Sequence, residues 1–230
     1  MNVPEEEPIV AGMVTRSIEG AQRKVEGHNF DIRKHLLDYD NIMNQQRTII
    51  YGMRREIMEG KDVERKFLDY LGDVVSDVLE KHAPEGKRQE EWHLEDMNTA
   101  LSQQFGLRIE FESFPVINPE TITEAASKAV KDVYERQKQN LTQFFAQIQK
   151  MVLLQAIDHR WKEHLAMIDH LKEGIGLRGY ASKDPVIEYK KEAFNAFDTM
   201  LHAIKMDAIE KMLKVQIVAS EQEQVVQEME

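Results

Sequence analysis

The feature that most limits how this chain can fold is a long, unbroken helical pattern near its start. Apolar and aromatic residues recur there at steps of three or four, or multiples of these: Val14, Ile18, Ala21, Val25, Ile32, Leu36, Tyr39, Met43, Ile50, Met53 and Ile57. No proline occurs between residues 9 and 83. The pattern predicts one helix over about 10–58, which at 1.5 Å per residue is about 70 Å long. Such a helix passes several packing partners in turn, so we expect it to act as a scaffold.

The middle of the chain predicts shorter elements. An amphipathic helix should run from Val63 to about His82, and a second one, containing Met97, Leu101 and Phe105, should end at Gly106. Residues 107–117 alternate weakly, which allows at most one short strand or strand pair. Asn118 and Pro119 are a typical N-cap and first-turn proline for a helix reaching about residue 138. These elements predict a small helical domain inserted between longer ones.

The last part predicts a helical hairpin. The inner face of its first helix should carry Phe144, Ile148, Met151, Leu154, Ile157, Trp161, Leu165, Ile168 and Leu171. After a break over 173–183, Asp184 and Pro185 should start the second helix, with Ile187, Phe194, Phe197, Leu201, Ile204, Ala208, Met212 and Val215 inside. Two helices of about 30 residues with a short connection must lie antiparallel. We expect Trp161, Leu165, Phe194 and Phe197 to form the hairpin core.

Together these patterns predict an all-α fold. A very long scaffold helix (1–60) would pack with an antiparallel two-helix hairpin (142–218). A small helical wing domain (61–141) would be inserted between them. Residues 219–230 are polar and rich in glutamate, which is typical of a flexible linker.

Composition excludes several classes of function. The chain has 41 acidic and 30 basic residues, a net charge of −11, which argues against a partner that is a nucleic acid. Cysteine is absent, so disulfides, thiolate metal sites and a cysteine nucleophile are excluded. The longest runs without charge, 97–107 and 139–149, are eleven residues each, well below the roughly 20 that a membrane span needs. The first residues include Glu5, Glu6 and Glu7 and do not resemble a signal peptide.

Catalytic motifs are absent from the sequence. Neither the phosphate-binding pattern GxxxxGK[ST] nor HExxH occurs. The densest group of catalytic residue types is Asp158, His159, Glu163, His164, Asp169 and His170. Its histidines are five and six residues apart, about 140° and 240° around a helix, so they cannot converge on one metal ion without partners from elsewhere in the chain. We expect a solvated helix face with i,i+4 pairs of Asp158 with Lys162 and His159 with Glu163, and no catalytic, cofactor-binding or metal-binding residue.

The predicted connection of the hairpin has an unusual composition. Gly174, Gly176 and Gly179 would free the backbone, while Ile175, Leu177 and Tyr180 place apolar bulk at a tip that is normally polar. Exposed groups of this kind indicate a contact with another molecule. Alternatively, Ile175 and Leu177 could fold back onto the hairpin. Tyr180, a large ring with a hydroxyl group, is the best candidate for an outward contact.

Several segments resemble the SecA family of bacterial preprotein translocase ATPases. MVTRSIE (13–19), AQRKVE (21–26) and NFDIRK (29–34) are similar to the start of that family's helical scaffold domain. AIDHRWKEHL (156–165), LRGYA (177–181) and KDP (183–185) are similar to its two-helix finger. The matches bracket residues 13 to about 218, and the segment 61–141 is identified as the helical wing domain by its position between them.

The resemblance implies a fragment of an ATP-driven motor, not itself an enzyme, that moves unfolded secretory preproteins through a SecY-type channel. Two nucleotide-binding domains using ATP and Mg²⁺ would precede the chain, and a zinc-binding tail would follow it. Tyr180, with Ile175, Leu177 and Arg178, would contact the moving polypeptide or the channel, and the hairpin would restrain the ATPase.

The family's location would be cytoplasmic, with peripheral association to the inner membrane. Homodimerisation stays open. Two alternatives from other classes are a purely structural or regulatory helical module, and a metal-dependent hydrolase that uses the cluster His159–His170.

Overall fold

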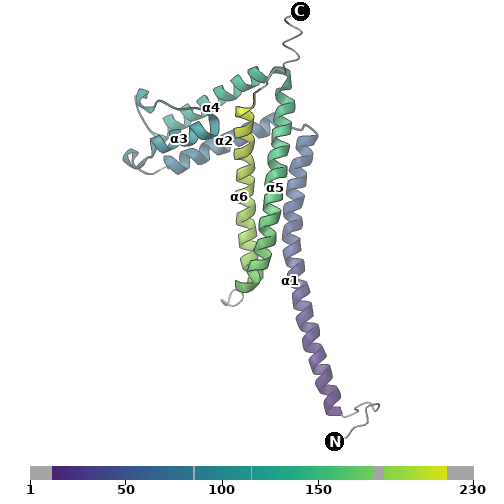
Figure 1. The fold of residues 1–230 in the computed structure, drawn as a ribbon. Helices are drawn as coiled ribbons and strands as arrows, with labels where there is room; N and C mark the ends of the chain where they lie inside the picture. The colour runs from purple at the N-terminus through teal and green to yellow at the C-terminus, as the bar shows by residue number, and fades with distance from the viewer. Residues whose placement is uncertain (1–11, 85, 115, 179–183, 217–230) are drawn as a thin grey trace, which may run out of the picture. The chain divides into compact units, whose positions relative to one another are not determined.

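The computed structural model describes residues 12–84, 86–114, 116–178 and 184–216. Its α-helices, drawn in Figure 1, are α1 (Gly12–Met58), α2 (Val63–His82), α3 (Leu94–Phe105), α4 (Pro119–Leu141), α5 (Phe145–Arg178) and α6 (Pro185–Lys214). Short 3-10 turns occupy Gln89–Glu91, Phe111–Ser113 and Thr142–Phe144. No strand occurs among the described residues. The all-α prediction is confirmed.

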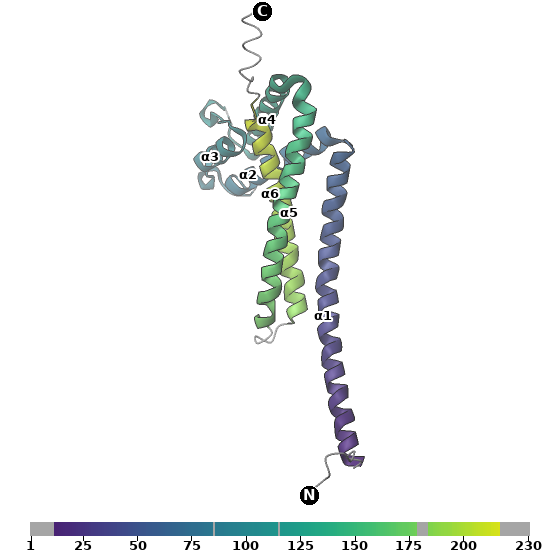
Figure 2. The same cartoon turned by 45° about the vertical axis from the view of Figure 1, so that its right-hand side comes forward.

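Helix α1 begins and ends within two residues of its predicted bounds, but its apolar stripe is buried along only part of its length. Met43, Ile50 and Ile57 are buried. Earlier members of the same stripe are exposed, for example Val25 at 59% and Ile32 at 45%. The periodicity therefore predicts the helix, whereas the extent of burial depends on where its packing partners lie. Figure 2 shows α1 along its whole length.

Helices α2, α3 and α4 form the wing, defined here as Val63–Leu141. Its core consists of Phe67, Leu71, Val74, Met97, Leu101, Phe105, Ile122, Ala126, Val130 and Tyr134. Gly106 ends α3 with a φ of 68°, a left-handed conformation that glycine adopts without steric cost. At the start of α4, Asn118 Oδ1 accepts from the Thr121 backbone N–H at 2.8 Å, and Thr121 Oγ1 accepts from the Asn118 N–H at 3.1 Å. The predicted ends of α2 and α3 and the predicted start of α4 are confirmed, whereas α4 continues to Leu141, past its expected end near residue 138.

The described residues within 107–117 form no strand, which agrees with the expectation of at most one short strand or strand pair there. Instead, the side chain of Asn98 on α3 pairs with the backbone of Ile109: its amide nitrogen donates to the Ile109 carbonyl at 3.0 Å, and its oxygen accepts from the Ile109 N–H at 2.9 Å. This side chain satisfies the two backbone groups that a neighbouring strand would otherwise have to pair. The weak alternation therefore does not correspond to a strand among the described residues.

The hairpin differs from its prediction mainly at the end of the first helix. Helix α5 continues to Arg178, so the break expected from residue 173 does not occur there. Helix α6 starts as predicted, because Asp184 Oδ1 accepts from the Val186 N–H at 2.8 Å and Pro185 takes the first helical position. Among the described residues, no helix has both the length and the apolar composition needed to cross a lipid bilayer.

Contacts group the described helices into two compact units. One contains α1 up to Thr48, α5 from His170 and α6 up to Phe194; the other contains α1 from Ile49, the wing, α5 up to Asp169 and α6 from Asn195. The three long helices thus contribute to both units. The predicted domain boundaries at 60, 141 and 218 remain predictions.

Candidate functional site in the helical hairpin

The hairpin core contains two of the four residues predicted for it. Trp161 and Phe197 are buried, and Leu165 is half-buried. Phe194 is 68% exposed, which contradicts its predicted place in the core. The buried face of α6 is instead Val186, Tyr189, Ala193, Phe197, Met200 and Ile204, at steps of three and four. Because Phe194 directly follows Ala193, it lies about 100° around the helix from that face.

Other expected members of the inner faces are also exposed, and these are Phe144, Met151 and Ile187. In each helix the buried face keeps part of the predicted set, such as Phe197, Ile204, Ala208 and Met212 in α6, and is completed by other residues. In α5 the predicted Ile157, Trp161 and Ile168 are buried, and they are joined by Val152, Leu153, Ala156 and His164, which were not predicted. A helical repeat with many apolar residues allows more than one stripe, and only the packing selects between them.

His164 is the clearest correction to the predicted charged face. It is 2% exposed and its ring lies between two aromatic rings, with centroids 5.5 Å from Trp161 and 5.7 Å from Phe197. Burial lowers the pKa of His164, because the imidazolium would lose its hydration there. The sequence carried a usable signal, since Ile157, Trp161, His164 and Ile168 follow steps of four, three and four.

The other two histidines of the cluster are exposed. His159 Nε2 lies 3.4 Å from Glu163 Oε1, as predicted, and His170 Nδ1 lies 3.8 Å from Glu173 Oε2. Within the described residues, no group of three or more His, Cys, Asp or Glu side chains could hold a metal ion.

An ion pair that sequence reasoning missed joins the two hairpin helices. Arg160 on α5 donates to both carboxylate oxygens of Asp207 on α6, each at 2.8 Å, and also to Glu163 at 2.9 Å. Hydrogen bonding to Asp207 raises the pKa of Arg160 above its ordinary value. A bidentate pair of this kind constrains both distance and orientation, so it fixes how α5 and α6 are aligned here.

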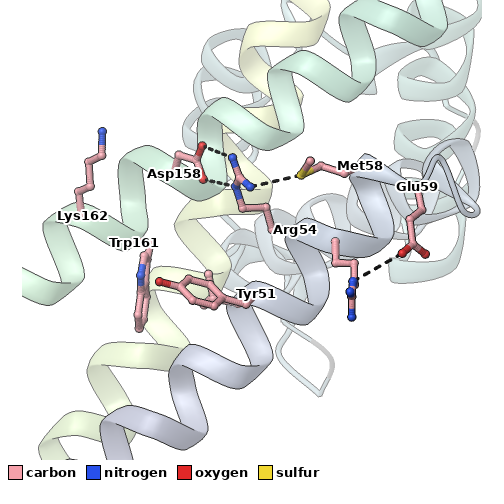
Figure 3. A pocket seen from close by; sticks show the side chains of 9 residues that line it. Tyr51, Arg54, Met58, Glu59, Asp158, Trp161 and Lys162 are labelled. Atoms are coloured by element: carbon pink, nitrogen blue, oxygen red, sulfur yellow. Dashed lines mark hydrogen bonds and ion pairs between the residues drawn. The ribbon is translucent and has the colours of Figure 1, made fainter.

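A second missed pair connects α5 to the end of α1. Asp158 Oδ1 accepts from Arg54 Nε at 2.9 Å, where an i,i+4 pair with Lys162 was predicted. Arg54 also donates to Met58 Sδ at 3.2 Å. Figure 3 shows this pair at the groove between the two helices, where the Tyr51 ring points toward Trp161.

The groove has a volume of about 660 Å³ and is lined by Ile50, Tyr51, Arg54, Arg55, Met58, Glu59, Asp158, Trp161 and Lys162. Its charged groups carry both signs, and the acid Asp158 is already bonded to Arg54. These residues therefore form a packed helix junction with an open side and do not define the chemistry of a ligand.

The predicted contact loop falls partly within α5. Ile175 is 1% exposed, which contradicts an outward contact at a tip and agrees with the alternative that this side chain packs onto the hairpin. It follows Ile168 by seven residues, two helical turns, and lies on the same buried face. Gly174 and Gly176 are helical, so neither supplies the predicted loop flexibility. Leu177 and Arg178 end α5, and their contact role remains a prediction. Gly179 and Tyr180 lie outside the described residues.

The structure defines a class of protein: an all-α chain in which a long helix and an antiparallel hairpin carry an inserted three-helix wing. Residues 8–216 match the family model described as the SecA Wing and Scaffold domain. The chain belongs to this family.

Curated relatives match almost the whole chain. The protein translocase subunit SecA of Bdellovibrio bacteriovorus is 61% identical over 99% of this chain, and the same subunit of Syntrophus aciditrophicus is 42% identical over 94%. That of Geobacter metallireducens is 42% identical over 96%. This chain spans only 25–26% of the length of these relatives.

Proposed function

We propose that this chain is the wing and scaffold part of a SecA-type motor that drives secretory preproteins through a SecY-type channel. Support comes from the family match over residues 8–216 and from relatives named protein translocase subunit SecA. The relatives are about four times as long, so the motor activity belongs to a longer protein than the segment matched here.

The observation that carries this proposal is the fixed alignment of the hairpin helices. Trp161, His164 and Phe197 pack across the pair, and Arg160 holds Asp207 through two hydrogen bonds. A hairpin that transmits a displacement has to keep its two helices in register, because slippage would absorb the motion. The core and the ion pair together oppose such slippage.

In this proposal the connection between α5 and α6 meets the moving polypeptide or the channel. Tyr180 supplies a large amphipathic ring that can contact many sequences. Leu177, Arg178 and Gly179 directly precede it in the sequence, and Leu177 and Arg178 would share the contact. Nucleotide-binding domains of the same protein would bind ATP and Mg²⁺, and the hairpin would restrain their ATPase. Zinc would bind a tail outside this chain, and the motor would associate with the cytoplasmic side of the inner membrane.

A substitution at Tyr180 in the full-length translocase tests this role. Tyr180→Ala should strongly reduce preprotein transport and leave basal ATP hydrolysis nearly unchanged, because it removes the contacting ring but no nucleotide ligand. Transport would be measured as protease-protected preprotein in membrane vesicles. Tyr180→Phe should keep most transport if the area of the ring matters more than its hydroxyl group.

The matched control is Tyr51→Ala, which removes a ring that is 55% exposed on α1. It should leave transport near the wild-type level. Full transport by the Tyr180→Ala variant would reject the contact role and favour a purely structural or regulatory module.

A further inference from the structure

The wing is joined to the rest of the chain by two segments with unusual backbone conformations. Between α1 and α2, Gly60 has a φ of 74° and Asp62 a φ of 50°. After α4, Thr142 has a φ of 46° and a ψ of −122°. Asp62 and Thr142 are the non-glycine residues with positive φ among the described residues, and they lie at the two ends of the wing.

These conformations are unfavourable for residues with a Cβ atom. Positive φ brings Cβ close to the backbone carbonyl, and a β-branched residue such as threonine is a clear outlier there. The φ and ψ of Thr142 match the first central position of a type II′ turn, which glycine normally occupies. Strained residues of this kind persist only where the surrounding structure holds them, so other contacts must keep the wing in its observed place.

Those contacts include a set of polar bonds between the wing and α6, which Figure 1 draws next to each other. Lys205 Nζ lies 2.6 Å from Asp73 Oδ2, and His202 Nδ1 lies 3.1 Å from Asp77 Oδ2. Asp73 and Asp77 are each about half exposed, at 53% and 50%. The Lys205–Asp73 contact is a partly exposed ion pair, which contributes little to stability and is screened by salt. The His202–Asp77 contact is a single polar contact at the surface, so both can break readily.

Two amide side chains of the wing also bond to backbone carbonyls of α6 and the residue after it. Gln104 on α3 donates to the Met206 carbonyl at 2.8 Å. Gln137 on α4 donates to the carbonyls of Met212 at 3.0 Å and Val215 at 2.7 Å. The last carbonyls of a helix lack partners within the helix. The C-terminal end of α6 is therefore partly capped by the wing.

A different set of contacts lies next to the Thr142 junction. The ring of Tyr134 on α4 packs against Phe145 on α5 at a centroid distance of 5.4 Å, and Gln149 donates to the Tyr134 hydroxyl at 3.0 Å. These groups are buried and close in sequence to the junction, so they can persist while the more distant bonds to α6 break. The wing also has its own apolar core, which keeps it folded.

We infer that the wing turns as a unit about the junctions Gly60–Asp62 and Thr142, between a docked and a released state. The polar contacts with α6 hold the docked state, and strain at the junctions opposes them. In the released state the end of α6 loses the cap that Gln137 provides. This inference does not depend on the proposed function.

Spin labels can measure the movement directly, because the chain contains no cysteine. The full chain would carry one of three pairs of exposed cysteines. Glu124→Cys with Thr199→Cys measures the distance between the wing and α6. Two control pairs measure distances that should not change: Asp69→Cys with Glu124→Cys lies within the wing, and His159→Cys with Thr199→Cys lies within the hairpin. Distance distributions would be recorded by double electron–electron resonance.

Combining Lys205→Ala with His202→Ala should raise the ratio of released to docked molecules by roughly three- to tenfold, as expected for the loss of one ion pair and one polar contact at the surface. The larger released fraction should appear as a second peak in the distance distribution of the wing-to-α6 pair, and not in those of the two control pairs. About 1 M NaCl should act in the same direction in the unsubstituted chain. An unchanged wing-to-α6 distance under both conditions would overturn the inference, and so would simultaneous broadening of all three pairs.

The junction is tested by Thr142→Gly, with Gln143→Gly as the matched control in the same 3-10 turn. Glycine tolerates the observed φ, so Thr142→Gly should raise the thermal midpoint and reduce the released fraction at high salt. Gln143 is not among the residues with positive φ, so Gln143→Gly should lower the midpoint. If the thermal midpoint fell equally in the two variants, Thr142 would not be strained, and its role as a junction about which the wing turns would be rejected.

Discussion

Burial between Trp161 and Phe197 lowers the pKa of His164 from its ordinary value of 6.5. A pKa that is lower in the folded than in the unfolded state means that the unfolded chain binds the proton more readily. The contribution of neutral His164 to the free energy of unfolding is therefore complete above about pH 6.5, where the histidine is neutral in both states. This contribution is lost as the pH falls through the folded-state pKa. This residue should make the fold sensitive to acid.

We predict that His164→Gln reduces the loss of stability between about pH 7.5 and pH 5, because glutamine does not titrate. The urea midpoint of the variant should fall less between these pH values than that of the wild type, whatever its starting value at pH 7.5. Exposed His170→Gln serves as the control and should leave the wild-type fall unchanged. A fall in His164→Gln as large as in the wild type would assign the acid sensitivity to other groups.

At the scale of elements, the alignment of α5 with α6 depends on contacts between residues far apart in sequence. Arg160 and Asp207 are 33% and 17% exposed, so their pair is less solvated than an ordinary surface pair. A double-mutant cycle with Arg160→Ala and Asp207→Ala should give a coupling free energy of roughly 1–2 kcal/mol. The free energies of unfolding would be obtained by urea denaturation.

The control for this cycle is the pair Glu210 and Lys214, which lies within α6 and is about half exposed. Its coupling should be roughly 0.3–0.5 kcal/mol, as is typical of i,i+4 pairs on helix surfaces. If the two cycles gave the same coupling, the bidentate pair would have no special role in fixing the hairpin.

At the scale of the whole molecule, α1 carries one apolar stripe with two different environments. Ile32 and Ile50 are the same residue type on the same helix, but they are 45% and 1% exposed. Ile50→Ala should cost roughly 2–4 kcal/mol of unfolding free energy because it leaves a cavity. Ile32→Ala should stay within about 0.5 kcal/mol, apart from its small change in helix propensity.

Thermal or urea unfolding of the two alanine variants checks this difference directly. A cost at Ile32 similar to that at Ile50 would show that the first half of the stripe is covered in solution. That result would contradict the exposure seen along α1.

The sequence by itself determined where most helices begin and end. Asn118 with Pro119, Gly106, and Asp184 with Pro185 mark ends that the structure reproduces. These signals are reliable because capping and helical periodicity involve residues within about four positions of one another. The similarity of segments such as 156–165 to the SecA family was also legible in the sequence, and the family match bears it out.

Only the tertiary structure decided which of several possible helix faces is buried and which charges pair. It places Ala193 inside and Phe194 outside, and it pairs Asp158 with Arg54, 104 positions away in the chain. It also buries His164, and it places the Asn98 side chain where it hydrogen-bonds to the backbone N–H and carbonyl of Ile109. The physical reason is that desolvation and ion pairing depend on groups brought close by packing, whereas local spacing offers several equivalent choices.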